Sequence, residues 1–95
     1  MNRRTKLDPA AVEEKLAALA GWALKDGKLH REYKFDDFVA AFRFMSGVAL
    51  VAERMDHHPE WSNVYNRVVV DLNTHDVGGL TELDFELARA ADRMA

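Results

Sequence analysis

The sequence predicts an α+β domain, in which three helices pack on one face of a four-stranded antiparallel sheet in the order α-β-β-α-β-β-α. Two pairs of short extended segments, within residues 22–35 and 61–72, each surround a tight-turn signal. Helical patterns precede, separate and follow these pairs. Because each pair forms a hairpin, the sheet is antiparallel, and helices connected in this order cover one of its faces.

The first helix is predicted from Pro9 to about Ala20. Asp8 can accept hydrogen bonds from free N–H groups of the first turn, where the missing N–H of Pro9 costs nothing. Gly21 is suited to ending the helix. The apolar residues recur at spacings of four and three, as one buried stripe requires, at Val12, Leu16 and Leu19.

The first hairpin is predicted around Asp26-Gly27, which joins segments 22–25 and 28–35. Both turn residues tolerate the positive φ that a two-residue hairpin turn needs. In the second segment His30 falls on the polar, solvent-facing side. Arg31 falls on the apolar side, with Leu29, Tyr33 and Phe35.

The long helix is predicted to begin at Asp36 or Asp37 and to reach about Met55. It has two apolar stripes, the first with Phe38, Phe42, Met45, Ala49 and Ala52 and the second with Ala41, Phe44, Val48, Val51 and Met55. One sheet face covers only one stripe. We therefore expect part of the other stripe to lie in the interface of a homodimer or homotetramer.

The second hairpin is predicted to begin with a strand from Trp61 to Tyr65 and to turn at Asn66. Its second strand buries Val68, Val70 and Leu72 on one face. Residues 74–79 form a loop in which Gly78-Gly79 allows a sharp reversal. Thr81 and Asp84 match a capping box at the start of the last helix, whose stripe is Leu83, Leu87 and Ala91.

The 95 residues suffice for a single domain over residues 1–95, with residues 1–7 expected as a mobile tail. The net charge of −3 and the pI of about 5.7 argue against direct nucleic-acid binding, which usually uses a basic face. The absence of cysteine excludes disulfides and thiolate metal sites. Neither a membrane-spanning run of roughly 18 apolar residues nor a signal peptide is recognisable, so we expect a cytoplasmic protein.

Three of the four histidines lie in segments that follow secondary structure. His57 and His58 follow the long helix, and His75 follows the last strand. Carboxylates lie close by in the sequence, at Glu53, Asp56 and Asp76. An imidazole exchanges protons near neutral pH, and a neighbouring carboxylate can fix its tautomer. The pattern predicts a metal-free acid–base site for a small polar molecule.

The residues after the histidine pair favour the same interpretation. Pro59 biases His58 toward an extended conformation, and Trp61 offers a flat apolar surface to a planar ring. Zinc binding is the competing interpretation, but adjacent His57-His58 point in different directions in most backbones. A structural role for each histidine also stays open, and Asp84 by spacing is a helix cap. Nucleophilic catalysis has little support, because Ser46 and Ser62 lie in no recognisable elbow.

Four segments resemble the pterin-4a-carbinolamine dehydratases, at residues 56–61 (DHHPEW), 63–66 (NVYN), 72–75 (LNTH) and 79–84 (GLTELD). Gly21-Trp22 and residues 38–53 match as well, so the resemblance covers nearly the whole chain. His-His-Pro-Glu-Trp with a downstream Thr-His is specific to the family, whereas His-His-Pro alone would not be. The family fold is a four-stranded antiparallel sheet with three helices on one face.

The resemblance implies a hydro-lyase that dehydrates 4a-hydroxytetrahydropterin to quinonoid dihydropterin, without a metal or organic cofactor. The reaction recycles the pterin cofactor of aromatic amino-acid hydroxylases. The implied catalytic residues are His57, His58 and His75, and the implied substrate-binding residues are Glu53, Asp56, Pro59, Trp61, Thr74 and Asp84. We assign proton transfer to His58 and His75, and the orientation of the hydroxyl to His57.

The resemblance also leaves a second class of function open. Animal members of the family bind the dimerisation helix of a homeodomain transcription factor through their long helix. A non-catalytic protein-binding module would therefore have the same two-stripe helix signature.

Overall fold

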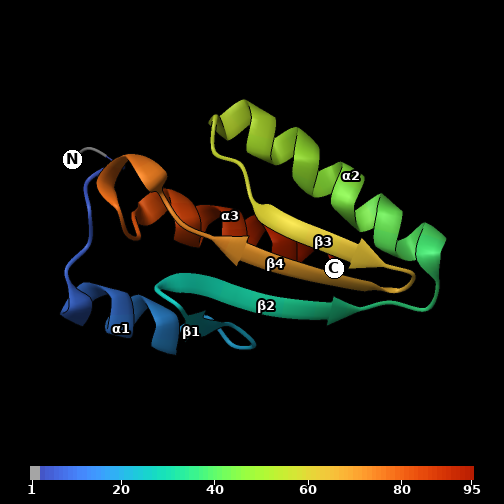
Figure 1. The fold of residues 1–95 in the computed structure, drawn as a ribbon, viewed down its shortest axis with the longest axis horizontal. Coiled ribbons are helices and arrows are strands. Elements are labelled where there is room, and N and C mark those ends of the chain that lie inside the picture. The colour runs from blue at the N-terminus through green and yellow to red at the C-terminus, as the bar shows by residue number, and fades with distance from the viewer. Residues whose placement is uncertain (1–2) are drawn as a thin grey trace.

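The predicted fold class is confirmed by the computed structural model, which describes residues 3–95. The chain folds into three α-helices and one four-stranded antiparallel sheet, in the predicted order (Figure 1). The elements are α1 (Pro9–Ala17), β1 (Ala23–Lys25), β2 (Lys28–Lys34), α2 (Phe38–Met55), β3 (Glu60–Val64), β4 (Arg67–Leu72), the 3-10 turn η1 (His75–Val77) and α3 (Glu82–Met94).

The strands lie in the order β1-β2-β4-β3, so the two hairpins join through β2 and β4. In the first hairpin Asp26 and Gly27 take φ values of 53° and 78°, as the turn signal predicts. In the second, Tyr65 takes the positive φ of 51° and Asn66 follows it. The side chain of Asn66 donates a hydrogen bond to the backbone oxygen of Phe35 at 2.9 Å, which ties the second turn to the end of β2.

The core lies on one face of the sheet. The buried strand residues are Leu29, Tyr33, Val68, Val70 and Leu72, which share that face, and α2 packs against both α3 and β4. From α2 the buried residues are Ala41, Phe44, Val48 and Ala52. The second predicted stripe therefore faces the core, joined by Ala52 from the first. Phe38 and Phe42 of the first stripe remain about half exposed, at 48% and 57%.

Helix α1 is shorter than predicted. It ends at Ala17, and not at Ala20, because the chain continues in tight turns closed by hydrogen bonds from Leu19 to Leu16 and from Trp22 to Leu19. These turns place Leu19 and Trp22 in the core. Gly21, with φ of 89°, lies in this segment after the helix.

Arg31, the cation on the apolar face of β2, has an anionic partner from α3. Its Nη1 donates to Oδ1 of Asp92 at 3.1 Å, and the Nε1 of Trp22 donates to the same oxygen at 3.0 Å. The hydroxyl of Tyr33 also donates to Asp92. Burial and these contacts with Asp92 raise the pKa of Tyr33. The cluster joins the first hairpin to the end of α3.

Residues 3–7 of the predicted mobile tail run beside the body of the domain. Arg3 forms an ion pair with Glu86 at 2.6 Å, and the backbone N–H of Leu7 donates to the oxygen of Leu80 at 2.8 Å. Residues 1–2 of that predicted tail lie outside the described residues. Within residues 3–95 no helix is long and apolar enough to cross a membrane.

Candidate active site

The end of α2 directs the histidine pair. Asp56 is the C-terminal cap of the helix, in the left-handed conformation with φ of 53° and ψ of 43°. The next backbone N–H, that of His57, returns to the oxygen of Ala52 at 3.0 Å. This reversal buries the side chain of His57, while that of His58 stays 58% exposed. Adjacent imidazoles thus enter different environments, as expected from their spacing.

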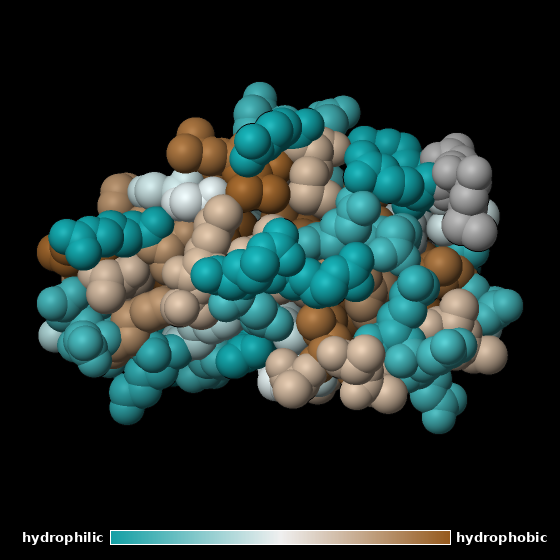
Figure 2. Space-filling model, turned by 180° about the vertical axis from the view of Figure 1, so that it is seen from behind, coloured by the Kyte–Doolittle hydropathy of each residue, from teal (hydrophilic) through white to brown (hydrophobic). Residues whose placement is uncertain are grey.

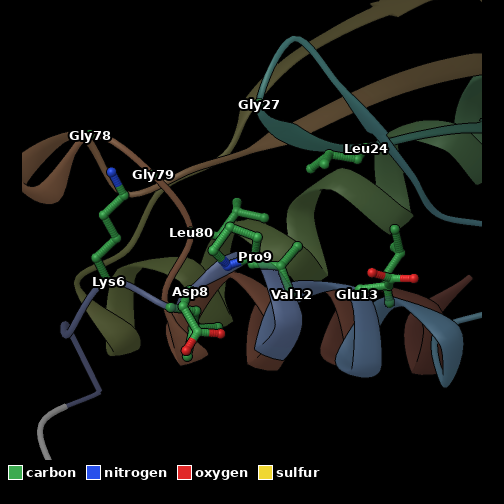
Figure 3. A pocket seen from close by; sticks show the side chains of 12 residues that line it. Lys6, Asp8, Pro9, Val12, Glu13, Leu24, Gly27, Gly78, Gly79 and Leu80 are labelled. Carbon is green, nitrogen blue, oxygen red and sulfur yellow. The ribbon is translucent and has the colours of Figure 1, made fainter.

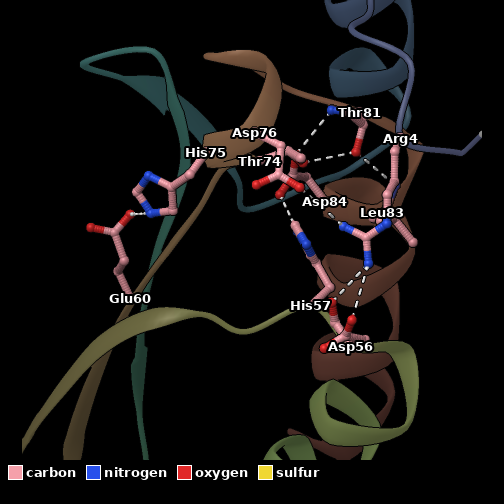
Figure 4. A network of polar contacts seen from close by, with 10 residues as sticks. All are labelled: Arg4, Asp56, His57, Glu60, Thr74, His75, Asp76, Thr81, Leu83 and Asp84. Atoms are coloured by element: carbon pink, nitrogen blue, oxygen red, sulfur yellow. Dashed lines mark hydrogen bonds and ion pairs between the residues drawn. The ribbon is translucent and has the colours of Figure 1, made fainter.

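His57 is bound to Asp84 inside the protein. Its Nε2 lies 2.6 Å from Oδ1 of Asp84, which is fully buried (Figure 4). The other carboxylate oxygen accepts hydrogen bonds from the Thr74 hydroxyl at 2.8 Å and from the Thr81 backbone N–H at 2.9 Å. The last contact belongs to the predicted capping box, which is present. Because an ionised carboxylate accepts hydrogen bonds, this contact favours the His57 tautomer that carries its proton on Nε2.

His58 pairs with a carboxylate from the last turns of α2. Its Nε2 lies 2.9 Å from Oε1 of Glu53, and both side chains are exposed. Asp56, also expected near the pair, extends into solvent instead, where its carboxylate lies 3.7 Å from Nη2 of Arg4.

His75 opens the turn η1, with its side chain 74% exposed. The carboxylate nearest to it is Glu60, whose Oε2 lies 3.5 Å from His75 Nε2. Asp76, the carboxylate that the sequence places beside His75, lies 4.0 Å from Nη1 of Arg4. Each of the three histidines thus has a carboxylate of its own, from α3, α2 or β3.

The three histidines line one pocket of about 290 Å³, a volume near the lower limit of ordinary small-ligand sites. Its walls are polar and consist of Arg4, Asp56, His57, His58, Asn73, Thr74, His75 and Asp76. The predicted site residues that lie outside this lining are Glu53, Pro59, Trp61 and Asp84. Glu53 and Asp84 contact the imidazoles of His58 and His57, which line the pocket. Trp61 packs against the hydrophobic core.

Two residues of the pocket wall were not predicted from the sequence. Arg4 donates from Nη2 to the backbone oxygen of Asp56 at 2.9 Å and thereby closes one side of the pocket. The sequence offered no sign of this contact, because the two residues lie 52 positions apart. Asn73 has a buried Oδ1 without a hydrogen-bond partner among the described residues, and its position beside Thr74-His75 was the available signal.

A second, larger cavity of about 830 Å³ lies between α1, the first hairpin turn and residues 78–80 (Figure 3). Its lining is mainly aliphatic, with Leu7, Val12, Leu16, Leu24 and Leu80, and contains no histidine. The three histidines singled out from the sequence therefore line the smaller cavity. Within residues 3–95 no three histidine or acidic side chains converge on a point where they would hold a metal ion.

Comparison with known proteins identifies the family of the chain. Residues 5–94 match the model of the family described as pterin 4 alpha carbinolamine dehydratase. The chain belongs to this family. A relative from Rhizobium etli, named for the same dehydratase, is 56% identical over 92 residues, which cover 95% of this chain and 91% of the relative. A relative from Solibacter usitatus with the same name is 54% identical over 91 residues, covering 96% of both chains.

A solved structure supports the family assignment at the level of the fold. It is the crystal structure of a transcriptional coactivator/pterin dehydratase from Brucella melitensis, with a TM-score of 0.92 and 48% sequence identity. The match covers 96% of this chain and 99% of that one. The pterin carbinolamine dehydratase fold therefore extends over almost all of the residues described.

Proposed function

We propose that this protein dehydrates 4a-hydroxytetrahydropterin to quinonoid dihydropterin by histidine acid–base catalysis. The observation that carries the proposal is the convergence of His57, His58 and His75 on one small polar pocket, each with its own carboxylate. The family to which the chain belongs supplies the class of substrate.

The proposed reaction breaks the bond between the ring carbon and its hydroxyl oxygen. One imidazolium gives a proton to the hydroxyl, which leaves as water, and one neutral imidazole takes a proton from a ring N–H. The two transfers balance, so no metal or organic cofactor enters the proposal. Imidazoles suit both steps because their ordinary pKa lies near neutral pH.

The different burial of the three rings supports a division of labour. His58 and His75 are exposed, so they can return to their starting protonation states by exchange with solvent. His57 is buried and held by Asp84, and its free Nδ1 can orient the substrate hydroxyl. We therefore assign proton transfer to His58 and His75, and binding to His57.

The remaining predicted residues support the rings in this proposal. Thr74 fixes Asp84, Glu53 orients His58, and Asp56 carries the backbone oxygen that holds Arg4 against the pocket. Pro59 connects the histidine pair to β3, and Trp61, the second residue of that strand, packs against the core.

Mixing the purified protein with the carbinolamine and following the ultraviolet change tests the activity. We expect acceleration over the spontaneous reaction, and its absence would reject the proposed enzyme. His58→Ala should lower kcat by about 10²–10⁴-fold. An unchanged kcat for both stereoisomers of the hydroxyl would reject the role given to His58.

The proposed physiological role is recycling of the pterin cofactor for an aromatic amino-acid hydroxylase in the cytoplasm. Deleting the gene in its host, with growth on phenylalanine as the measurement, tests that role separately from the chemistry. Normal growth of the deletion strain, with no accumulation of the carbinolamine, would contradict it.

A second candidate function, protein binding through α2, is favoured by its exposed face. Apolar side chains reach the surface over this helix (Figure 2), and the large ones are Phe38, Val39, Phe42 and Leu50. The Brucella relative is described as both coactivator and dehydratase. We propose that this face joins subunits into a homodimer or homotetramer. The alternative to be tested is that the face binds a helix of a different protein. A monomer at micromolar concentration in sedimentation would reject the oligomer.

A further inference from the structure

Glu60 lies between a lysine of the sheet and a histidine of the pocket. Its Oε1 accepts a hydrogen bond from Nζ of Lys28 at 2.9 Å, and its Oε2 lies 3.5 Å from Nε2 of His75. Figure 4 shows the carboxylate of Glu60 directed at the His75 ring, apart from the Asp84 cluster. The two oxygens of one carboxylate are thus given to two different partners.

The strand register explains why these residues meet. Glu60 pairs with Asp71 across β3 and β4, and Asp71 pairs with His30 across β4 and β2. Lys28 lies two residues before His30 and therefore on the same open face of the sheet. Asp71 is already paired with His30, whose Nδ1 lies 2.8 Å from Oδ1 of Asp71.

The charges at this end of the open face favour the same arrangement. The hydrogen bond to Glu60 raises the pKa of Lys28, and the negative charges of Glu60, Asp71 and Asp26 add to the effect. A lysine is already a cation at neutral pH, and these interactions strengthen that state in Lys28. Lys28 holds the Glu60 carboxylate at the start of β3, where the second oxygen faces His75.

We infer that Glu60, anchored by Lys28, is a positioning residue for His75, and that it selects the tautomer with the proton on Nε2. A carboxylate beside one ring nitrogen favours the N–H form of that nitrogen. Nδ1 of His75 is then the nitrogen that exchanges a proton with the substrate. The ring is 74% exposed, so without Glu60 it would sample both tautomers and several rotamers. The catalytic part of this inference rests on the proposed dehydration.

Two variants test the contributions of the Glu60 carboxylate and of its lysine partner separately. Glu60→Gln removes the charge and keeps the shape, and Lys28→Met removes the anchor and keeps the length of the side chain. Lys28→Arg retains the cation and is the conservative rescue. The matched control is Glu32→Gln, which removes another carboxylate–cation pair on the same sheet face, between Glu32 Oε1 and Arg67 Nε at 2.8 Å.

The first measurement is ¹⁵N NMR of the His75 side chain at a pH where the ring is neutral. We expect mainly the Nε2–H tautomer in the wild type, a shift toward Nδ1–H in Glu60→Gln and Lys28→Met, and a spectrum close to wild type in Lys28→Arg and Glu32→Gln. The second is steady-state dehydration. Glu60→Gln should lower kcat about 10-fold and leave KM within about twofold, because positioning and not binding is lost.

An unchanged tautomer ratio in Glu60→Gln would overturn the inference, and so would an altered ratio with wild-type kcat. The NMR comparison does not depend on activity. If the wild type fails to accelerate dehydration, the proposed function is rejected while the spectra still decide whether Glu60 selects the tautomer of His75.

Discussion

His57 and Asp84 are separated by 27 residues in sequence, yet Nε2 of the ring and Oδ1 of the carboxylate lie 2.6 Å apart in the protein interior. The same carboxylate accepts from the backbone of Thr81 at the first turn of α3. One side chain therefore caps a helix and fixes an imidazole. Changes at Asp84 should affect folding and the site together.

Asp84→Asn should destabilise the fold by about 2 kcal/mol, because an amide cannot accept from all the donors that now face the buried carboxylate. Urea unfolding followed by circular dichroism measures the change. Thr81→Ser keeps the capping hydroxyl and removes one buried methyl group, so as the control it should lose less stability, about 1 kcal/mol. Wild-type stability of Asp84→Asn would show that the buried pair contributes little to the fold.

His57→Ala and His58→Ala should separate stability from turnover. The first removes a buried ring and leaves Asp84 without its partner, so the free energy of unfolding should decrease and KM should increase. The second removes an exposed ring, so stability should hold while kcat falls. Unfolding and steady-state kinetics on the same preparations provide the comparison. Equal losses of stability would contradict the burial that distinguishes the two rings.

Stability should fall at alkaline pH through Tyr33. Burial first, and then the hydrogen bond and charge of Asp92, raise its pKa in the folded state above the ordinary value of about 10. Below pH of about 10 both states hold the proton, and the stabilisation is complete. Above it the unfolded state ionises first, so the free energy of unfolding decreases as pH rises.

The effect of pH on Tyr33 is measured by urea unfolding at pH 8 and pH 10.5. Tyr33→Phe should lose the part of the alkaline decrease that this hydroxyl causes. The matched control is Tyr65→Phe, at a position 61% exposed, which should keep the wild-type decrease. An identical pH dependence in Tyr33→Phe and wild type would refute the assignment.

Phe42→Lys should weaken self-association through α2, since Phe42 is 57% exposed and its ring packs only 5.9 Å, centroid to centroid, from that of Phe38. Sedimentation velocity across a concentration series measures this. Leu24→Lys changes a comparably exposed apolar residue on β1 and is the control. If both variants sediment like wild type, α2 is not the subunit interface.

Local sequence signals predicted most of the fold correctly. The Asp26-Gly27 turn, the Asp8 cap and the Thr81–Asp84 capping box are each satisfied within four residues, so their patterns were readable without tertiary information. The early end of α1 was not readable, because burial of Leu19 and Trp22 decides it. These are contacts with distant elements, which propensity does not contain.

For the site too, contacts between residues far apart in the sequence were not predicted. The three histidines singled out from the sequence do line one pocket, while their acid–base chemistry stays a proposal, and Glu53 was among the expected carboxylates. Glu60 was expected only as part of the segment 56–61, without a role of its own, and Asp76 was expected beside His75, because sequence neighbours were taken as partners. Cross-strand register brings Glu60 to His75 and Lys28 to Glu60 instead. Arg4 was missed for the same reason, since its contacts are with residues more than 50 positions away.

The left-handed residue at the end of α2 has a consequence for engineering. A residue with a Cβ holds this conformation at a cost of about 1 kcal/mol relative to glycine. Asp56 nevertheless occupies it, with an exposed side chain. Asp56→Gly would relieve the backbone, but it would also remove the carboxylate that lies 3.7 Å from Nη2 of Arg4. It would increase the conformational freedom of the unfolded chain as well, so the gain and the losses are of similar size. The peptide that directs the histidine pair therefore accepts few residues other than aspartate, asparagine and glycine.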